Sequence, residues 1–471
     1  MAGMEIPACG ISGNAQRREE YAALNSTIKW RAHVVGAALC VTLFVFARYA
    51  QMHGSYSIAC WLVAMFAMSA AVARLSQHEL TAATIIGWAI TMRLVAGFTP
   101  AFFEDDYFRF LWDGYRTLVD GNPYRLAPAE YFATFSGNDA MQDVLSHVNY
   151  PHVSTIYGPA LQNLFAVAAA IDAGALWPWK LIVMIADASV VALLVRTLGS
   201  RTLLYAWSPL VVHEIAVAAH PDGLVGALIL LAYLAARRGE FWWLAICVGT
   251  AAAMKVHAVL ALPFLIMLLA SHFARVTAAF ATVGIYAIYW LPYLDGFVNA
   301  WHSFATFARA WQFNALGFQL FLTLPSPVAR ALSLAGIAAL IAAAWHWQIH
   351  DREERLPMAL LMAFGALLFF SPVVNPWYLL CLLPLACATR YATPWIAAYV
   401  LPISYASDFN LGFASATDGR LPVWVSVVQW VAIAGAVIWD WRACHNCNQS
   451  SSCLTDDSDI HGQTARRLLS V

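Results

Sequence analysis

The sequence predicts an all-α protein whose helices form a polytopic bundle in a membrane. Of its 471 residues, 61% are hydrophobic and 11% are charged, whereas a soluble domain carries about 25% charged residues. Apolar runs close to the roughly 20 residues that cross a bilayer recur along the chain. These two observations exclude a water-soluble enzyme. The net charge of −1 leaves no basic surface for phosphates, so a nucleic-acid partner is excluded as well.

Apolar runs that are long enough, or nearly so, to be membrane spans follow one another from residue 33 onward. We place about 14 spans at residues 33–52, 56–73, 79–99, 180–197, 202–219, 222–236, 241–254, 257–271, 276–294, 328–347, 356–373, 376–389, 391–406 and 422–439. The polar residues 1–32 precede the first span. They contain Arg17, Arg18, Lys29 and Arg31, and such a cluster favours a cytoplasmic N-terminus.

The loop 100–179 is the longest interruption of this pattern, and charge decides how its apolar part, residues 157–175, is placed. If 157–175 does not cross the membrane, most later arginines fall on the cytoplasmic side. These are Arg196, Arg201, Arg237, Arg238, Arg275, Arg352, Arg355, Arg390 and Arg442. Basic residues prefer that side. We therefore expect 157–175 to be a helix lying on the outer surface, within a membrane domain over 33–442.

The end of the chain, residues 443–471, is polar and is predicted to be a disordered cytoplasmic tail. It contains Cys444 and Cys447 with His445 between them. A metal site there would need a second pair of ligands at suitable spacing, which is missing, so a reduced tail without a metal is favoured.

Charged residues are concentrated in the first outer loop, where eight of them fall between Glu104 and Arg125. They follow a predicted span directly and therefore lie at the membrane boundary. If this segment is helical, Asp106, Arg109 and Asp113 share one face and can pair. The Gly-Asn-Pro-Tyr sequence at 121–124 is expected to end that helix. A carboxylate here is a candidate general base or a ligand for a divalent metal, while the alternative is a solvated loop with ordinary salt bridges.

Other polar residues occur at predicted outer ends of spans. His213 and Glu214 precede the turn that holds His220 and Asp222. Ionisable residues at membrane depth indicate function by default, although a structural hydrogen-bonded pair is an equal alternative for His213 and Glu214. The spacing of seven residues predicts that His213 and His220 share a helix face. Lys255 follows a span at the next outer turn, where it can neutralise a phosphate or reach lipid headgroups.

Two later outer segments complete the set of polar elements. The loop 295–325 contains the sequence WQFN at 311–314, and an aromatic-rich loop of this kind is more often a membrane anchor than a substrate contact. The turn 371–378 contains Asn375 and Tyr378. Its prolines explain a turn without any function, and Asn375 is a candidate ligand-binding side chain. A polar site above an apolar bundle suits a substrate with a lipid tail and a polar head.

These motifs resemble integral-membrane glycosyltransferases of the GT-C superfamily, particularly bacterial mannosyltransferases that use polyprenyl-phosphate mannose. The resemblance rests on EDDYFRFLWDG at 104–114, GNPYRLAP at 121–128, STIYGPALQNLF at 154–165, HPDGL at 220–224, Lys255, WQFN at 311–314 and SPVVNPWYLLCLLP at 371–384. It covers about residues 80–440. A weaker similarity is to the first mannosyltransferase of GPI-anchor synthesis.

The resemblance implies a GT-C bundle with a catalytic acidic loop and an inverting transfer of a hexose, most simply mannose, from a polyprenyl-phosphate carrier to a glycan or lipid-linked acceptor. The acidic motif falls on Glu104, Asp105 and Asp106, with Asp106 the first candidate base and Asp105 the second. Glutamate replaces the usual first aspartate of the motif. No cofactor is certain. A divalent metal such as Mg²⁺ or Mn²⁺ would use Glu104 and Asp106.

The implied location is a bacterial inner membrane, with the active site facing the periplasm or exterior. Residues assigned to the donor phosphate or substrate are Arg109, Lys255, His220, Asp222, Asn375 and Tyr378. A transporter or flippase of lipid-linked sugars is the alternative, but it should carry charges in mid-membrane and show repeated halves with broken helices. A membrane scaffold without activity is a third possibility, for which the acidic loop would be replaceable.

Overall fold

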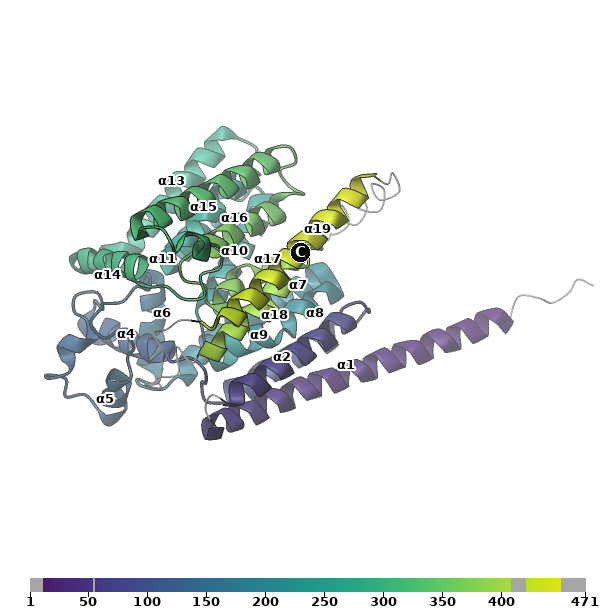
Figure 1. Ribbon diagram of the computed structural model, residues 1–471, viewed down its shortest axis with the longest axis horizontal. Coiled ribbons are helices and arrows are strands. Elements are labelled where there is room, and N and C mark those ends of the chain that lie inside the picture. Colours follow the sequence, from purple (N-terminus) through teal and green to yellow (C-terminus); the bar gives the residue numbers. More distant parts are fainter. Residues whose placement is uncertain (1–11, 54–55, 408–420, 450–471) are drawn as a thin grey trace, which may run out of the picture.

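The computed structural model describes residues 12–53, 56–407 and 421–449 of the chain. Within these ranges the regular structure is helical throughout, apart from one isolated β-bridge between Phe313 and Val373. The predicted all-α class is therefore confirmed for the described residues. The helices form one bundle, with a long first helix along one side (Figure 1).

Long apolar helices are fewer than predicted. Five helical stretches, or six if one bent pair counts as a single span, are long and apolar enough to cross a membrane, so about 14 spans are not confirmed. The five stretches lie in α1 (Ser12–His53), in α7 (Trp177–Leu198) with its continuation, in α13 (His272–Trp290) with α14 (Phe297–Ala310), in α15 (Ser326–Ile349) and in α19 (Val423–Gln449).

Several other predicted spans coincide with single helices. These are α2 (Tyr56–Leu75), α3 (Ala82–Gly97), α10 (Asp222–Arg237), α11 (Phe241–Met254) and α16 (Leu356–Phe370). Four of the five have 14 to 16 residues, which gives them a length of about 21–24 Å. A hydrocarbon core of about 30 Å exceeds that length.

The remaining predicted spans are broken into short pieces because each contains proline, which interrupts helical hydrogen bonding. The pieces are η2 (Gly199–Thr202), α8 (Leu203–Ala206), α9 (Pro209–Val212), η3 (His213–Val217), η4 (Val256–Leu260), α12 (Ala261–Ile266), η7 (Pro376–Cys381), α17 (Leu383–Ala386), α18 (Thr393–Val400) and η8 (Leu401–Ser407). Two further short segments are η5 (Leu291–Gly296) and η6 (Gly317–Phe321).

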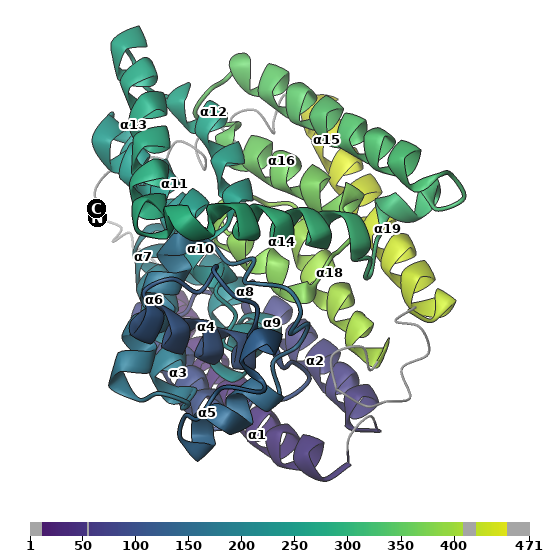
Figure 2. The ribbon, with the colours of Figure 1, turned by 90° about the vertical axis from the view of Figure 1, so that its left-hand side faces the viewer.

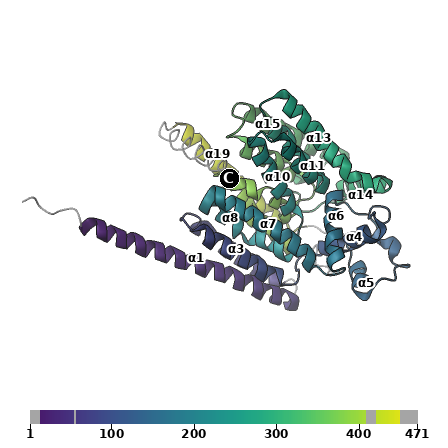
Figure 3. The ribbon, with the colours of Figure 1, turned by 180° about the vertical axis from the view of Figure 1, so that it is seen from behind.

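The first helix is longer than any span requires. α1 has 42 residues, or about 63 Å, and continues through the predicted N-terminal segment into the first span. Its N-terminal end and the C-terminal end of α19 both point away from α4 and α5 (Figures 1 and 3). The side chains of Cys444, His445 and Cys447 lie outside the described residues.

The loop 100–179 folds into a helical cap at the opposite end of the molecule. It contains α4 (Asp106–Asp120), η1 (Pro128–Tyr131), α5 (Asp139–Ser146) and α6 (Pro159–Ile171). In Figure 2 this end faces the viewer, with α14 lying across it beside α4. The predicted helix in 157–175 is α6, whose 13 residues are too few to cross a bilayer alone. α6 packs along α4, where a Cβ on Gly114 would meet the Phe165 carbonyl oxygen at 2.4 Å.

A sharp bend interrupts the chain after α9 and η3. The axes of 209–217 and of α10 meet at 114°, and η3 is a π-helical segment. Ala219 then adopts a left-handed backbone with φ of 61°. π-Helical segments and left-handed non-glycine residues both occur preferentially at functional sites. This bend carries the predicted residues Glu214, His220 and Asp222.

Candidate active site

Three consecutive carboxylates meet at the start of α4. One oxygen from each of Glu104, Asp105 and Asp106 can be chosen so that all three lie within 4.8 Å of one another. Glu104 is buried and its two neighbours are half-buried. Phe103, directly before them, has a left-handed φ of 67°, which turns the chain into the first residues of α4. The sequence prediction that these carboxylates form a cluster therefore agrees with the structure.

Two uncharged side chains hold this cluster in place. The Asn149 amide donates to Asp105 Oδ1 at 3.1 Å and to Asp106 Oδ1 at 2.8 Å. The Tyr157 hydroxyl donates to Asp106 Oδ2 at 3.3 Å. Each oxygen of Asp106 thus has a protein donor, which fixes the orientation of its carboxylate. Neither Asn149 nor Tyr157 was singled out from the sequence.

Burial and a neighbouring charge raise the pKa of Asp105 to about 7. Desolvation is the larger cause, and the adjacent Asp106 carboxylate adds to it, while the bond from Asn149 acts in the opposite direction. Crowded carboxylates resist holding several negative charges at once. The cluster is therefore suited to take up a proton or to bind a cation.

The same carboxylates match the chemistry of a divalent metal. Mg²⁺ and Mn²⁺ prefer oxygen ligands, and the three side chains offer carboxylate oxygens that converge within 4.8 Å. Glu104 is only 5% exposed, and a bound cation would reduce the repulsion among three neighbouring carboxylates. The residues present therefore fit the expected metal.

A cation lies across from the acidic cluster. Lys255 follows the last residue of α11, and its Nζ donates to Asp222 Oδ1 at 2.7 Å and to Oδ2 at 2.8 Å. The same Nζ is 6.0 Å from the ring centre of Tyr157 and 5.2 Å from that of Tyr378. Tyr157 therefore bonds to the acidic cluster and lies beside the lysine.

A glycine makes this connection possible. Gly158 donates its N–H to the Met254 carbonyl at 3.1 Å, and a Cβ at this position would meet the Ala253 carbonyl oxygen at 2.2 Å. No side chain fits in that space. The loop before α6 can therefore rest directly on the end of α11, which sets Tyr157 beside Lys255.

Glu214 is the centre of a buried network at the bend. Its carboxylate is 3.0 Å from His213 Nδ1, 2.8 Å from His220 Nδ1 and 2.6 Å from the Tyr405 hydroxyl. The prediction that the two histidines share a helix face is wrong, because the helix ends at Val217 and the chain reverses at Ala219. They meet instead through Glu214.

Each histidine of this network also packs against aromatic rings. The His220 ring stacks on Trp377 with centres 4.0 Å apart. The His213 ring lies 4.9 Å from that of Phe102 and 6.2 Å from that of Phe103. The network is thereby joined to the turn that carries the carboxylates.

The two late outer segments pair with each other. Phe313 donates its N–H to Pro372 and accepts from Val374, both at 2.9 Å, which forms the isolated β-bridge. Trp311 places its ring 4.0 Å from that of Tyr150, so this pair of segments lies against the acidic loop. The β-bridge therefore joins the segment that carries Asn375 and Tyr378 to residues packed on the acidic loop.

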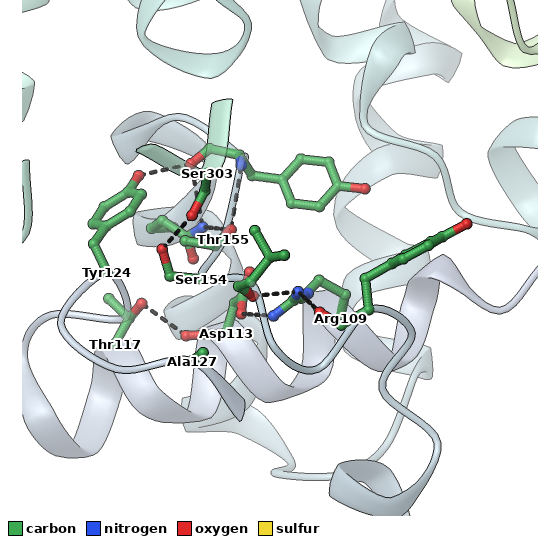
Figure 4. A network of polar contacts seen from close by, with 12 residues as sticks. Arg109, Asp113, Thr117, Tyr124, Ala127, Ser154, Thr155 and Ser303 are labelled. Carbon is green, nitrogen blue, oxygen red and sulfur yellow. Dashed lines mark hydrogen bonds and ion pairs between the residues drawn. The ribbon is translucent and has the colours of Figure 1, made fainter. Parts of the chain in front are cut away.

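Arg109 has a different environment from the one expected for a phosphate ligand. Its Nη2 donates to the carbonyls of Tyr150 and Val153 at 3.2 and 2.8 Å, and Nη1 is 3.9 Å from Asp113 Oδ1. Figure 4 shows the guanidinium between Asp113 on α4 and the following loop. The predicted pairing with Asp113 is present, but weak. Arg109 therefore holds residues 150–153 against α4.

Strained backbone conformations occur in the same segments that carry the predicted polar residues. The non-glycine residues with left-handed φ in the described part of the chain are Phe103, Tyr150, Ala219 and Asn314. Each lies within or directly beside a predicted outer polar segment. Such strain costs about 1–3 kcal/mol per residue and is concentrated at functional sites in proteins generally.

The described residues combine an all-helical bundle that contains long apolar helices, a cluster of three carboxylates and a nearby lysine, an arrangement compatible with a membrane enzyme. A family model described as "Alpha-(1->6)-mannopyranosyltransferase, N-terminal domain" matches residues 4–271, more than half of the chain. The chain therefore belongs to this mannosyltransferase family, as the sequence motifs indicated. No curated protein and no solved structure matches it. The matched range includes the carboxylates 104–106, Asp222 and Lys255.

Proposed function

We propose that this mannosyltransferase takes mannose from a polyprenyl-phosphate carrier and transfers it, with inversion, to a saccharide acceptor at the outer face of a bacterial inner membrane. The observation that carries the proposal is the short link through Tyr157, which joins the carboxylate of Asp106 to the cation of Lys255. An acid–base group and a phosphate-binding group at one site are what this reaction requires.

In the proposed reaction, Asp106 is the general base and Asp105 is the second candidate. The acceptor hydroxyl loses its proton to the carboxylate as its oxygen bonds to the anomeric carbon. The bond from that carbon to the phosphate oxygen breaks, and the polyprenyl phosphate leaves with the electron pair. A single displacement inverts the anomeric carbon, so an α product requires a β-linked donor.

Lys255 is the proposed ligand for the leaving phosphate, since negative charge grows there during transfer. Asp222 and Tyr378 contact it, and these two residues, with His220 and Asn375, are candidate substrate contacts. Nη2 of Arg109 already donates to loop carbonyls. Holding both substrates at one surface reduces the entropic cost of their encounter. A divalent metal, if bound, would be held by Glu104 and Asp106 and would neutralise phosphate charge.

The proposed topology follows from the same assignment. Residues 33–442 form the membrane domain, residues 1–32 and 443–471 face the cytoplasm, and the acidic loop faces the opposite side. The bend between η3 and α10 is a broken helix of the kind also found in transporters. Membership in an enzyme family favours transfer over transport.

The test is the double substitution Asp105→Asn with Asp106→Asn in membranes supplied with radiolabelled polyprenyl-phosphate mannose. We expect labelled product to fall at least a hundredfold, with normal expression, because removal of a general base typically costs 10²–10⁴ in rate. The matched control is Asp143→Asn, an exposed carboxylate of the same loop, which should retain transfer. Full transfer by the double variant would refute the assigned site.

A further inference from the structure

Asn314 is a buried amide that lacks hydrogen-bond partners. Its side chain is 4% exposed, and neither its nitrogen nor its oxygen has a partner among the described residues. An Asn side chain offers two donors and an acceptor with two lone pairs. Burying them unpaired is destabilising, and native proteins rarely do so without a functional reason.

The backbone at this position does not explain the amide. Asn314 has a left-handed φ of 48°, a conformation that asparagine tolerates but glycine adopts at no steric cost. Glycine would satisfy the turn without burying polar atoms. The backbone conformation alone therefore does not require a buried amide at this position.

A second unpaired amide oxygen lies in the neighbouring segment. Asn375 Oδ1 is buried and also lacks a partner among the described residues. Asn314 directly follows Phe313, and Asn375 directly follows Val374, the residue whose N–H bonds to the Phe313 carbonyl at 2.9 Å. The β-bridge thus brings the two asparagines to the same end of the paired segments.

This end of the paired segments borders the proposed reaction centre. The Asn375 side chain hydrogen-bonds to Tyr378, whose ring is 5.2 Å from Lys255 Nζ. On the other side, Trp311 packs on Tyr150. Burial first, and then the carboxylates of Asp106, Asp105 and Glu104, raise the pKa of Tyr150 to about 12. The asparagines therefore lie near Tyr378, which is beside the lysine, and near Tyr150, which is close to the acidic cluster.

We propose that Asn314 and Asn375 form an amide pair that binds the hydroxyl groups of a saccharide at the transfer site. Vicinal sugar hydroxyls both donate and accept, which matches the unpaired amide atoms. A saccharide fits better than a phosphate, because the pair itself carries no charge. The amide atoms are buried in this conformation. Binding of a saccharide therefore requires residues around 311–316 to move and expose them. The proposal rests on the mannosyl transfer proposed above.

The hydroxyls can belong to the donor mannose or to the acceptor, and kinetics separates the two. The variants are Asn314→Gly, which keeps the left-handed backbone, and Asn375→Leu, which keeps the approximate volume. The matched control is Gln319→Ala, since Gln319 is an amide of the same region whose nitrogen donates to Ser426 at 3.0 Å. Each full-length protein is assayed at varied polyprenyl-phosphate mannose and at varied methyl mannoside acceptor.

We expect an approximately tenfold rise in one KM for Asn314→Gly, as for the loss of one or two neutral hydrogen bonds, and none for Gln319→Ala. A rise in the donor KM assigns the pair to the donor mannose, and a rise in the acceptor KM assigns it to the acceptor. Thermal stability should be unchanged or higher, because an unsatisfied amide is removed. If Asn314→Gly does not fold, Asn375→Leu provides the same comparison.

Direct binding keeps this test separate from the proposed function. Methyl α-mannoside binding to the purified protein, followed by saturation-transfer NMR, should weaken about tenfold in both asparagine variants. A wild-type protein that binds the mannoside but does not use polyprenyl-phosphate mannose would refute the donor and leave the amide pair intact. Unchanged saccharide affinity and unchanged KM values in both variants would overturn the amide pair.

Discussion

Lys255 and Asp222 are 33 residues apart in the sequence and form a two-point ion pair, with Nζ at 2.7 and 2.8 Å from the two carboxylate oxygens. The Asp222 side chain is 1% exposed and that of Lys255 is 14% exposed. The lysine therefore keeps a path to solvent while its partner is fully enclosed. In the proposed reaction the leaving phosphate shares this ammonium with Asp222.

Replacing Lys255 by Met should destabilise the protein and abolish transfer. The buried Asp222 carboxylate loses its partner, which typically costs about 3–5 kcal/mol. Combining Lys255→Met with Asp222→Asn should restore most of the thermal stability, because no unpaired charge remains. Transfer should stay lost, since the cation for the leaving phosphate is absent. A double variant that transfers mannose at the wild-type rate would show that Lys255 only supports the fold.

Replacing Tyr157 by Phe should lower kcat about tenfold, which corresponds to about 1.4 kcal/mol, and leave the fold intact. The hydroxyl donates to Asp106 Oδ2 at 3.3 Å, and its loss frees the carboxylate to rotate. The aromatic ring beside Lys255 remains. The control is Tyr131→Phe, which removes a similar bond to Asp120 at 3.1 Å in the same loop. Equal rates for the two variants would argue against a positioning role for Tyr157.

Replacing Gly158 by Ala should reduce both stability and transfer. The added Cβ would meet the Ala253 carbonyl oxygen at 2.2 Å and that of Met254 at 2.8 Å, so the loop must move away from α11. Overpacking of this kind typically costs about 1–3 kcal/mol. It also separates Tyr157 from Lys255. We expect a lower melting temperature and a lower kcat in the same variant.

The control for this substitution is Gly87→Ala, where a Cβ on α3 meets nothing within 4 Å. Alanine within a helix should be neutral or stabilise it by up to about 1 kcal/mol. If Gly158→Ala behaves like Gly87→Ala in both melting temperature and rate, close approach of the loop to α11 is not required.

The charged residues of the site were predictable because the sequence otherwise avoids charge. Glu104, Asp105 and Asp106 stand out in an apolar chain, and the helix that follows them ends at Gly121 with φ of 75°, as its sequence predicts. Lys255 and Asp222 were each predicted at outer turns, but their pairing was not, since spacing along the chain does not reveal contacts across a bundle.

Uncharged members of the site were missed for a different reason. Asn149, Tyr157 and Tyr405 belong to residue types that are common in any loop or helix, and their roles come from contacts made at a distance in the sequence. The Gly158-Pro159 step after Tyr157 was the one local signal. About 14 spans are not confirmed for the described residues, and hydropathy does not register breaks such as the bend at Ala219.

Asp113 should make stability depend on pH between about 4 and 6. Its side chain is fully enclosed on α4, and burial raises its pKa to about 6, although Arg109 and bonds from Thr155 and Gln162 act in the opposite direction. The folded protein therefore holds a proton more tightly than the unfolded chain. As pH rises through this window, the unfolded state ionises first and is favoured, so the stability contribution falls.

The measurement is the melting temperature of wild type and of Asp113→Asn from pH 3.5 to 7.5. The asparagine cannot ionise, so the difference, variant minus wild type, should grow from pH 4 to about 6 and then level off. The part of the difference in melting temperature that does not vary with pH comes from the hydrogen bonds changed by the substitution. A difference that stays flat through the window would mean that Asp113 has an ordinary pKa. Its enclosure between Arg109 and α6 would then admit enough water to solvate the charge.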